Sequence, residues 1–117
     1  MNTVDQTQLA LTRLLDATAF RHRVLANNLA NADTPGYIRQ EVPFESELAD
    51  AVKSGELADF KMTVTEDRSA TPRADGNNVQ LDYELSEINK NALLHQMAVQ
   101  LMQAKLSMQR TAITGRA

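Results

Sequence analysis

The placement of helix-breaking residues constrains this 117-residue chain more than any other feature. All three prolines and three of the four glycines lie between residues 35 and 76, and the fourth glycine is Gly115. Residues 1–34 and 77–114 contain neither residue type, so proline and glycine interrupt no helix there. We therefore divide the chain into a helical, coiled-coil-like domain, formed by residues 1–34 and 77–117, and a loop-rich segment, formed by residues 35–76.

The N-terminal segment carries a stripe with the spacing of one helix face. Its members are separated alternately by four and three residues: Leu11, Leu15, Thr18, His22, Leu25 and Leu29. We predict a helix from about residue 5 to about residue 31. It should end before the sequence DTPG at residues 33–36, because proline disfavours helix at Thr34 and Pro-Gly is a turn pair.

The C-terminal segment carries a longer stripe. It runs through Leu81, Leu85, Ile88, Ala92, His95, Val99, Met102, Leu106, Gln109 and Ile113. The turn DGNN at residues 75–78 offers an asparagine N-cap and Gly115 a C-terminal stop, so we predict a helix over residues 79–114. At 1.5 Å per residue this helix would be ~54 Å long. A compact chain of this size has a radius of gyration of only ~13 Å, so the molecule should be elongated.

The middle of the chain predicts only short elements. The spacing of Phe44, Leu48, Ala51 and Val52 indicates a short helix that ends near Gly55. Met62 and Val64 alternate with polar residues, a pattern typical of a strand, and residues 66–78 are expected to form a loop. The predicted fold class is mainly α. Two long terminal helices pair as a coiled-coil-like hairpin, and the loop-rich middle holds a short helix and a short strand.

The C-terminal helix has more apolar surface than one partner helix covers. It extends beyond the N-terminal stripe, carries further apolar residues off its own stripe, and has no charged residue between 91 and 104. Since a helix that is apolar on more than one face is usually buried on more than one side, we predict an assembly interface at residues 91–108. The full set of candidate interface residues is Leu11, Leu15, Leu25, Leu29, Leu85, Ile88, Leu94, Val99, Leu101, Met102, Leu106, Met108 and Ile113. The plainer interpretation is an intramolecular helical core.

Composition argues against several classes of protein. The net charge is −3, and residues 41–67 hold eight acidic and two basic residues, whereas a nucleic-acid-binding protein needs a basic surface. The absence of cysteine excludes disulfides and thiolate metal sites. We also expect no cleaved signal peptide and no membrane span, because no segment has the required apolar run.

Residues with possible chemistry are few. His22 and His95 both lie within the helical stripes, but a metal site needs three or four ligands, so histidines satisfied in a helix interface are favoured. Glu45, Glu47 and Asp50 form an acidic run, which we interpret as surface because acid–base catalysis needs a pocket that shifts a pKa. We therefore expect no catalytic residue, cofactor or metal.

The most informative segment is ANNLANADTPGY at residues 26–37. Asparagines at a helix end can hydrogen-bond the loose backbone groups, and an aromatic residue can anchor the exit of the chain. The segment resembles the N-terminal signature of bacterial flagellar rod, hook and hook-associated proteins. The residues that carry this resemblance are Asn27, Asn28, Asn31, Thr34, Pro35, Gly36 and Tyr37. The sequences DGNNV at residues 75–79 and QRTAITGR at residues 109–116 are similar to those of proximal-rod members of the family.

This resemblance implies a structural subunit of the basal-body rod, the periplasmic drive shaft that also encloses an export channel. The implied partners are copies of the chain, other rod proteins, the adaptor between rod and ring, the membrane ring and the flagellar type III export apparatus. Three alternatives stay open: another rod subunit of the same family, a helical-hairpin adaptor or secretion chaperone, and a small enzyme that uses His22 or His95. The adaptor predicts a stable small dimer in solution.

Overall fold

The structure is a computed structural model that describes residues 6–115. Its elements, in chain order, are helix α1 (Gln6–Ala30), strand β1 (Gln40–Glu41), helix α2 (Phe44–Ser54), the 3-10 helix η1 (Leu57–Asp59), strand β2 (Thr65–Glu66) and helix α3 (Leu81–Thr114). The predicted fold class is confirmed, since two long terminal helices flank a middle with one short α-helix and a two-stranded sheet. The predicted start near residue 5 and the end of the chain at residues 116–117 lie outside the described residues.

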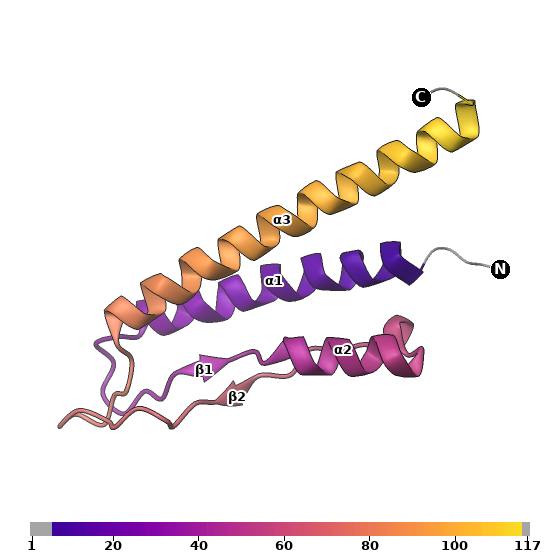
Figure 1. Ribbon diagram of the computed structural model, residues 1–117. Helices are drawn as coiled ribbons and strands as arrows, with labels where there is room; N and C mark the ends of the chain where they lie inside the picture. Colours follow the sequence, from indigo (N-terminus) through magenta and orange to yellow (C-terminus); the bar gives the residue numbers. More distant parts are fainter. Residues whose placement is uncertain (1–5, 116–117) are drawn as a thin grey trace.

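Helices α1 and α3 pair as an antiparallel hairpin (Figure 1). The end of α1 and the start of α3 meet at one end of the molecule, and α3 diverges from α1 toward its own C-terminus. The principal extents are 64 × 28 × 15 Å and the radius of gyration is 17.9 Å. The elongated shape is therefore confirmed. Within residues 6–115, no helix has both the length and the apolar content needed to cross a membrane.

The apolar core lies between α1 and the middle segment. Its buried residues are Ala17 and Val24 of α1, Val42 between β1 and α2, and Phe44 at the start of α2. Half-buried side chains pack around them: Leu14, Phe20, Leu48, Phe60, Met62 and Leu94. In Figure 1, α2 and the two strands run along α1 on the side away from α3. The long hairpin is thus held to the middle segment by apolar packing contributed chiefly by α1.

The ends of three helices agree with the prediction. Helix α1 finishes at Ala30, one residue before the expected stop. Helix α2 ends at Ser54, where Gly55 adopts a left-handed conformation (φ 76°) and donates its backbone N–H to the Ala51 carbonyl. Helix α3 ends at Gly115 in the same way (φ 71°). Glycine tolerates this conformation without steric cost, which is why it marks helix ends reliably.

The predicted start of α3 is wrong by two residues. The helix begins at Leu81, and its N-cap is Gln80, which makes no side-chain cap hydrogen bond. The asparagines expected to cap it have other partners. Asn77 Oδ1 accepts the backbone N–H of Val79, and Asn78 Nδ2 donates to the Asp67 carbonyl. These bonds hold the chain in a turn, so the helix starts later.

The strand predicted from the alternation of Met62 and Val64, within residues 61–66, is confirmed in part, because β2 occupies only the last two of these residues. The two strands are β1 and β2, which pair antiparallel with Gln40 opposite Glu66 and Glu41 opposite Thr65. Met62 instead packs against the core. The sequence of β1 and β2 contains no alternation of apolar and polar residues, because neither strand buries a face, and strand prediction depends on that alternation.

Candidate assembly site

Asn28, in the last turn of α1, is fully buried and hydrogen-bonded on both sides of its amide group. Its Nδ2 donates to the Gln40 carbonyl (2.8 Å) and to Glu84 Oε1 (3.2 Å). Its Oδ1 accepts the Gln40 backbone N–H (2.9 Å) and the Tyr37 hydroxyl (3.0 Å). Asn27 Nδ2 donates to the same hydroxyl (3.0 Å). One side chain of the signature therefore joins α1 to α3 and to the chain that leaves the turn.

The remaining polar residues of the signature complete the end of α1. Asn31 Nδ2 donates to the Asn27 carbonyl (2.8 Å), and its Oδ1 accepts the Thr34 hydroxyl (3.0 Å). Asn77, from the segment before α3, donates Nδ2 to the carbonyls of Asn31 (2.9 Å) and Thr34 (2.8 Å). Carbonyls at a helix end lack partners within the helix, so Asn77 satisfies groups that the end of α1 leaves open.

Two glycines bring the backbones of these segments into contact. A Cβ built on Gly76 would lie 3.2 Å from the Gly36 Cα, and both residues have positive φ, 85° and 75°. The Gly36 N–H donates to the Asp75 carbonyl (2.8 Å). We call this contact between residues 27–37 and residues 73–79 the clasp. The signature and the DGNNV segment, far apart in sequence, form it together.

A buried charged cluster lies beside the clasp. Arg39, 3% exposed, donates Nε to Glu84 Oε2 (2.5 Å) and Nη1 to Asp67 Oδ2 (2.6 Å). Its backbone N–H donates to Asn78 Oδ1 (2.7 Å), and its guanidinium lies 4.9 Å from the Tyr83 ring centre. Glu84 is fully buried. Removing one partner of such a pair leaves an uncompensated buried charge, which is strongly destabilising.

Two members of the cluster, Arg39 and Asp67, are stabilised in their charged forms. Burial alone would lower the pKa of Arg39, but its hydrogen bonds and Coulombic attraction to Glu84, with a further hydrogen bond to Asp67, raise that pKa above its usual value. Hydrogen bonds from the Ser69 side chain and backbone, followed by Arg39, lower the pKa of Asp67. Burial is the main reason that the pKa of Tyr37 is raised. Arg39 and Asp67 therefore stay charged in the folded chain at neutral pH.

The contact between α1 and α3 is polar or small along much of its length. The buried residues of α3 are Glu84, Asn91 and Ala98, each seven residues after the last. Asn91 Nδ2 donates to the Thr18 carbonyl (2.8 Å), and the Thr18 hydroxyl lies 2.7 Å from His95 Nδ1. Polar residues at such positions fix the register of paired helices at a cost in stability.

Helix α1 therefore covers only part of the C-terminal stripe. Ile88 and Met102 are half-buried, but Leu85 and Leu106 are exposed. The face of α3 that meets α1 starts at Glu84 and is offset from the apolar stripe by about one residue, which rotates every second member of the stripe outward. Hydrophobic periodicity alone could not reveal this offset, because the face that contacts α1 carries the polar residues Glu84 and Asn91.

The structure places the candidate interface residues in three groups. Leu25 is buried. The half-buried residues are Leu11, Leu15, Leu29, Ile88, Leu94, Val99 and Met102. The exposed residues, 42% to 85% accessible, are Leu85, Leu101, Leu106, Met108 and Ile113, and Leu93 and Met97 are exposed as well. Much of the apolar surface of α3 thus has no cover within the described chain, and exposed apolar surface on this scale is typical of an interaction site.

The two histidines lie near one another. His22 and His95 line a cleft of about 360 Å³ with Thr18 and Asn91. Within residues 6–115, no three histidine, aspartate or glutamate side chains gather as metal ligands.

The acidic run is held by different partners. Arg21 binds both oxygens of Glu45 (2.8 and 2.5 Å), and Thr63 donates to Glu47. Burial would raise the pKa of Glu45, but the hydrogen bond from Arg21 lowers it overall.

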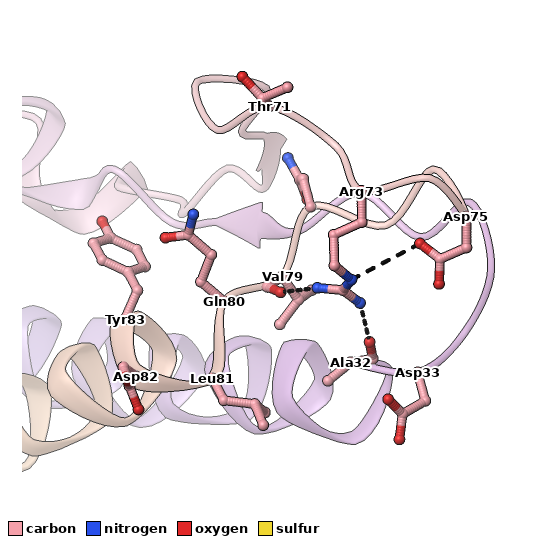
Figure 2. Close-up of a pocket in the computed structure, with 11 residues that line it drawn as sticks. Ala32, Asp33, Thr71, Arg73, Asp75, Val79, Gln80, Leu81, Asp82 and Tyr83 are labelled. Carbon is pink, nitrogen blue, oxygen red and sulfur yellow. Dashed lines mark hydrogen bonds and ion pairs between the residues drawn. The ribbon is translucent and has the colours of Figure 1, made fainter.

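A cleft of about 740 Å³ opens beside the clasp (Figure 2). Figure 2 shows Arg73 reaching between the end of α1 and the start of α3, where it donates to the carbonyls of Ala32 (2.6 Å) and Val79 (2.6 Å). Its Nε lies 3.9 Å from Asp75 Oδ1. Arg73 is the only basic side chain among the lining residues. The Arg73 guanidinium therefore connects the segments on either side of the cleft through hydrogen bonds, and it is not available to bind an anion there.

Sequence reasoning missed Arg39, Asp67, Glu84 and Arg73, all of which hold the closed end of the hairpin. One signal was present: Glu84 shares a heptad position with Asn91 and Ala98, so a charged residue lies on a face that must be buried. The other three come from loops, where no periodicity exists to indicate which side chains turn inward.

Comparison with known proteins gives consistent matches. The model of the family described as "Flagella basal body rod protein" matches residues 15–37, the second half of α1 and the signature. The flagellar basal body rod protein FlgB of Bacillus subtilis (strain 168) is 30% identical, with 90% of this chain and 91% of that protein covered. FlgB of Aquifex aeolicus (strain VF5) is 32% identical, with 90% of each covered. FlgB of Escherichia coli (strain K12) is 32% identical, with 79% and 81% covered.

Proposed function

The chain belongs to the FlgB-type flagellar basal body rod proteins, and on this premise we propose how it is built to assemble. It is a structural subunit of the basal body rod. In the proposal, residues 1–34 and 77–117 form an inner domain that packs against copies of the chain and other rod proteins. Residues 35–76 form the outer segment. The assembled subunits make a helical drive shaft around an export channel.

The observation that carries this proposal is the exposed apolar surface of α3. Leu101 is 55% exposed and Met108 62% exposed, although both lie within α3. No charged residue lies between residues 91 and 104. Apolar side chains gain roughly 25 cal/mol for each Å² removed from water, so burial against neighbouring subunits would favour assembly.

The clasp supports the same proposal from the other end of the hairpin. It fixes the angle at which α1 and α3 leave the turn, through bonds made by Asn28, Asn77 and the close approach of Gly36 to Gly76. We propose that the signature residues serve this purpose, with Pro35 on the exposed side of the turn. A subunit that must fit a helical lattice needs such a fixed geometry.

The finer assignments follow from the family and are proposals. We propose the rod-to-ring adaptor, the membrane ring and the type III export apparatus as further partners, and export without a cleaved signal peptide. We also propose that the chain has no catalytic role. The named relatives are rod proteins, and the residues with possible chemistry, such as Glu45 and His95, are engaged in structural contacts.

The test replaces one exposed apolar residue of α3. We expect Leu101→Asp to leave the free energy of unfolding within about 0.5 kcal/mol of the original, because the side chain is exposed in the isolated chain. In cells that lack the native subunit, this variant should restore neither complete rods nor swimming, because assembly would bury an unpaired charge.

The matched control is Gln100→Asp, which adds the same charge at an exposed neighbouring position of α3. It should support normal swimming. Swimming of the Leu101→Asp cells at the original level would contradict the assignment of this surface to assembly.

A further inference from the structure

The cleft beside the clasp, which we call the clasp cleft, combines acidic residues with an exposed apolar side chain. Three of its lining residues are acidic: Asp33, Asp75 and Asp82. Its one basic lining residue, Arg73, is already bonded to backbone carbonyls. Leu81 belongs to the same lining and is 54% exposed. A surface that complements this cleft therefore carries a basic group beside apolar side chains.

Asp33 is the carboxylate most available to a basic partner. It is exposed, and within the described part of the chain its side chain has no hydrogen bond or ion pair. Asp75 accepts the backbone N–H of Asn77 and lies 3.9 Å from Arg73, and Asp82 lies in the first turn of α3, where the helix dipole favours a negative charge. Asp33 instead follows the end of α1, where the dipole disfavours a negative charge (Figure 2). A cation from outside the chain would therefore relieve an unfavourable charge there.

The far end of α3 carries a surface of the complementary kind. Helix α3 has no acidic residue after Glu87, and Arg110 is its last basic residue. Arg110 is exposed, and its side chain has no hydrogen bond or ion pair among the residues that the structure describes. Leu106 and Ile113, 42% and 85% exposed, lie four residues before it and three after it, so all three share one side of the helix. We call these three residues the distal face.

The distal face and the clasp cleft lie at opposite ends of one chain. Leu81 and Arg110 are ~44 Å apart along α3 at 1.5 Å per residue, and Figure 1 shows the C-terminal end of α3 far from the closed end of the hairpin. The two surfaces can therefore meet only between copies. A head-to-tail pair leaves one cleft and one distal face open, so further copies can add to it in a row.

We propose that the distal face of one copy docks in the clasp cleft of a second copy, with Arg110 paired to Asp33 and with Leu106 and Ile113 packed on Leu81. An arginine can bind a carboxylate through two parallel hydrogen bonds, which fix direction as well as partner. The contact rests on the proposed function for its open, head-to-tail geometry, and it adds which parts of two neighbouring subunits meet.

The absence of cysteine makes the contact directly testable. Leu81→Cys places a thiol in the clasp cleft and Ile113→Cys places one on the distal face, both at exposed positions. Under mild oxidation, a mixture of the two full-length single variants should give the mixed disulfide dimer in several-fold excess over either homodimer. The double variant should give a ladder of oligomers, because each copy carries both halves of the contact.

The matched control for position is Leu93→Cys, which is 62% exposed on the same helix, ~18 Å from Leu81, and outside the cleft. Mixed with Ile113→Cys, it should crosslink several-fold less than Leu81→Cys. An equal yield from this control overturns the proposal. A single closed dimer from the double variant also overturns it, and would favour an adaptor-like protein.

Exchange of charges tests the ion pair separately. Arg110→Asp in the chain that carries Ile113→Cys should lower the crosslink to Leu81→Cys several-fold, and Asp33→Arg in the cleft chain should restore it. Asp50→Arg, at an exposed position outside the cleft, is the control and should restore nothing. Circular dichroism of each variant should stay unchanged, because all three side chains are exposed. A yield that Asp33→Arg leaves low, or that Asp50→Arg restores equally, overturns the assigned pair.

The same disulfide is then sought in isolated basal bodies, after the variants are produced in cells. Basal bodies that contain the chain without the crosslink between positions 81 and 113 refute the docking contact and leave the rod function intact. Basal bodies that lack the chain refute the rod function instead, and in that case the mixing experiment in solution still decides the contact.

Discussion

At the scale of single residues, the buried polar groups at the closed end of the hairpin carry most of the specificity. Asn28 makes four hydrogen bonds to three different segments, and Arg39, directly before β1, binds both α3 and the loop after β2. Buried polar groups are costly unless all of them are paired. We therefore expect most substitutions of Asn28 or Arg39 to be destabilising. Each of their bonds favours one arrangement of α1, α3 and the segment around β1.

Asn28→Ala tests this directly. The change leaves the buried Glu84 and the Gln40 backbone without one of their partners, so we expect the free energy of unfolding to fall by about 2–3 kcal/mol. Urea denaturation followed by circular dichroism measures it. Asn27→Ala, at an exposed neighbour whose side chain makes one hydrogen bond, should cost under about 1 kcal/mol. Equal losses for the two variants would argue against the role assigned to Asn28.

At the scale of elements, the sequence predicts helices and their ends well but not their mutual orientation. The stops at Ala30, Ser54 and Thr114 follow from local chemistry, because a proline or a left-handed glycine ends a helix whatever surrounds it. The face of α3 that meets α1 depends on Glu84 and Arg39, which are brought together only in the folded chain. The same reason explains why β1 was not foreseen: its pairing is fixed by neighbours, not by its own residues.

The clasp joins two loop segments, and Gly76→Ala measures that contact. An alanine at either Gly76 or Gly55 must adopt positive φ, which costs about 1–2 kcal/mol. At Gly76 the new Cβ would also meet Gly36, whereas at Gly55 nothing lies within 4 Å. We therefore expect Gly76→Ala to lower the free energy of unfolding by at least about 1 kcal/mol more than Gly55→Ala. Thermal and urea unfolding of both variants would show the difference. Equal destabilisation would mean that Gly36 moves away from the new Cβ without lowering the free energy of unfolding further.

At the scale of the whole molecule, the middle segment is held to the hairpin both by apolar packing and by ion pairs. Arg21 of α1 binds Glu45 at the start of α2, and Arg39 binds Glu84 of α3. Within the segment, Arg39 also binds Asp67 just after β2. The carboxylates of Glu45 and Asp67 have a lowered pKa in the folded chain. Their contribution to stability is therefore complete above the ordinary values of 4.5 and 3.8, and it is lost as the pH falls through the lower values of the folded state.

Acid unfolding follows from this linkage. We expect the free energy of unfolding to decrease as the pH is lowered from about 5 to about 3, because the unfolded chain binds protons more readily at Glu45 and Asp67. In the Asp67→Asn variant the decrease should be shallower, since one of the two linked groups is gone. Urea titrations at several pH values measure the slope. A variant with the original slope would show that Asp67 does not contribute to the linkage.

The polar seam between α1 and α3 has a mechanical consequence. Glu84, Asn91 and Gln109 bind α1 at points spread along most of the length of α3. A smooth leucine interface lets helices slide past one another, because every displaced side chain finds an equivalent apolar seat. Hydrogen bonds at three positions along α3 oppose such sliding, because a force along the helix axis would have to break all three of them together. We therefore expect these contacts to resist sliding of α3 along α1 when the subunit is under axial load.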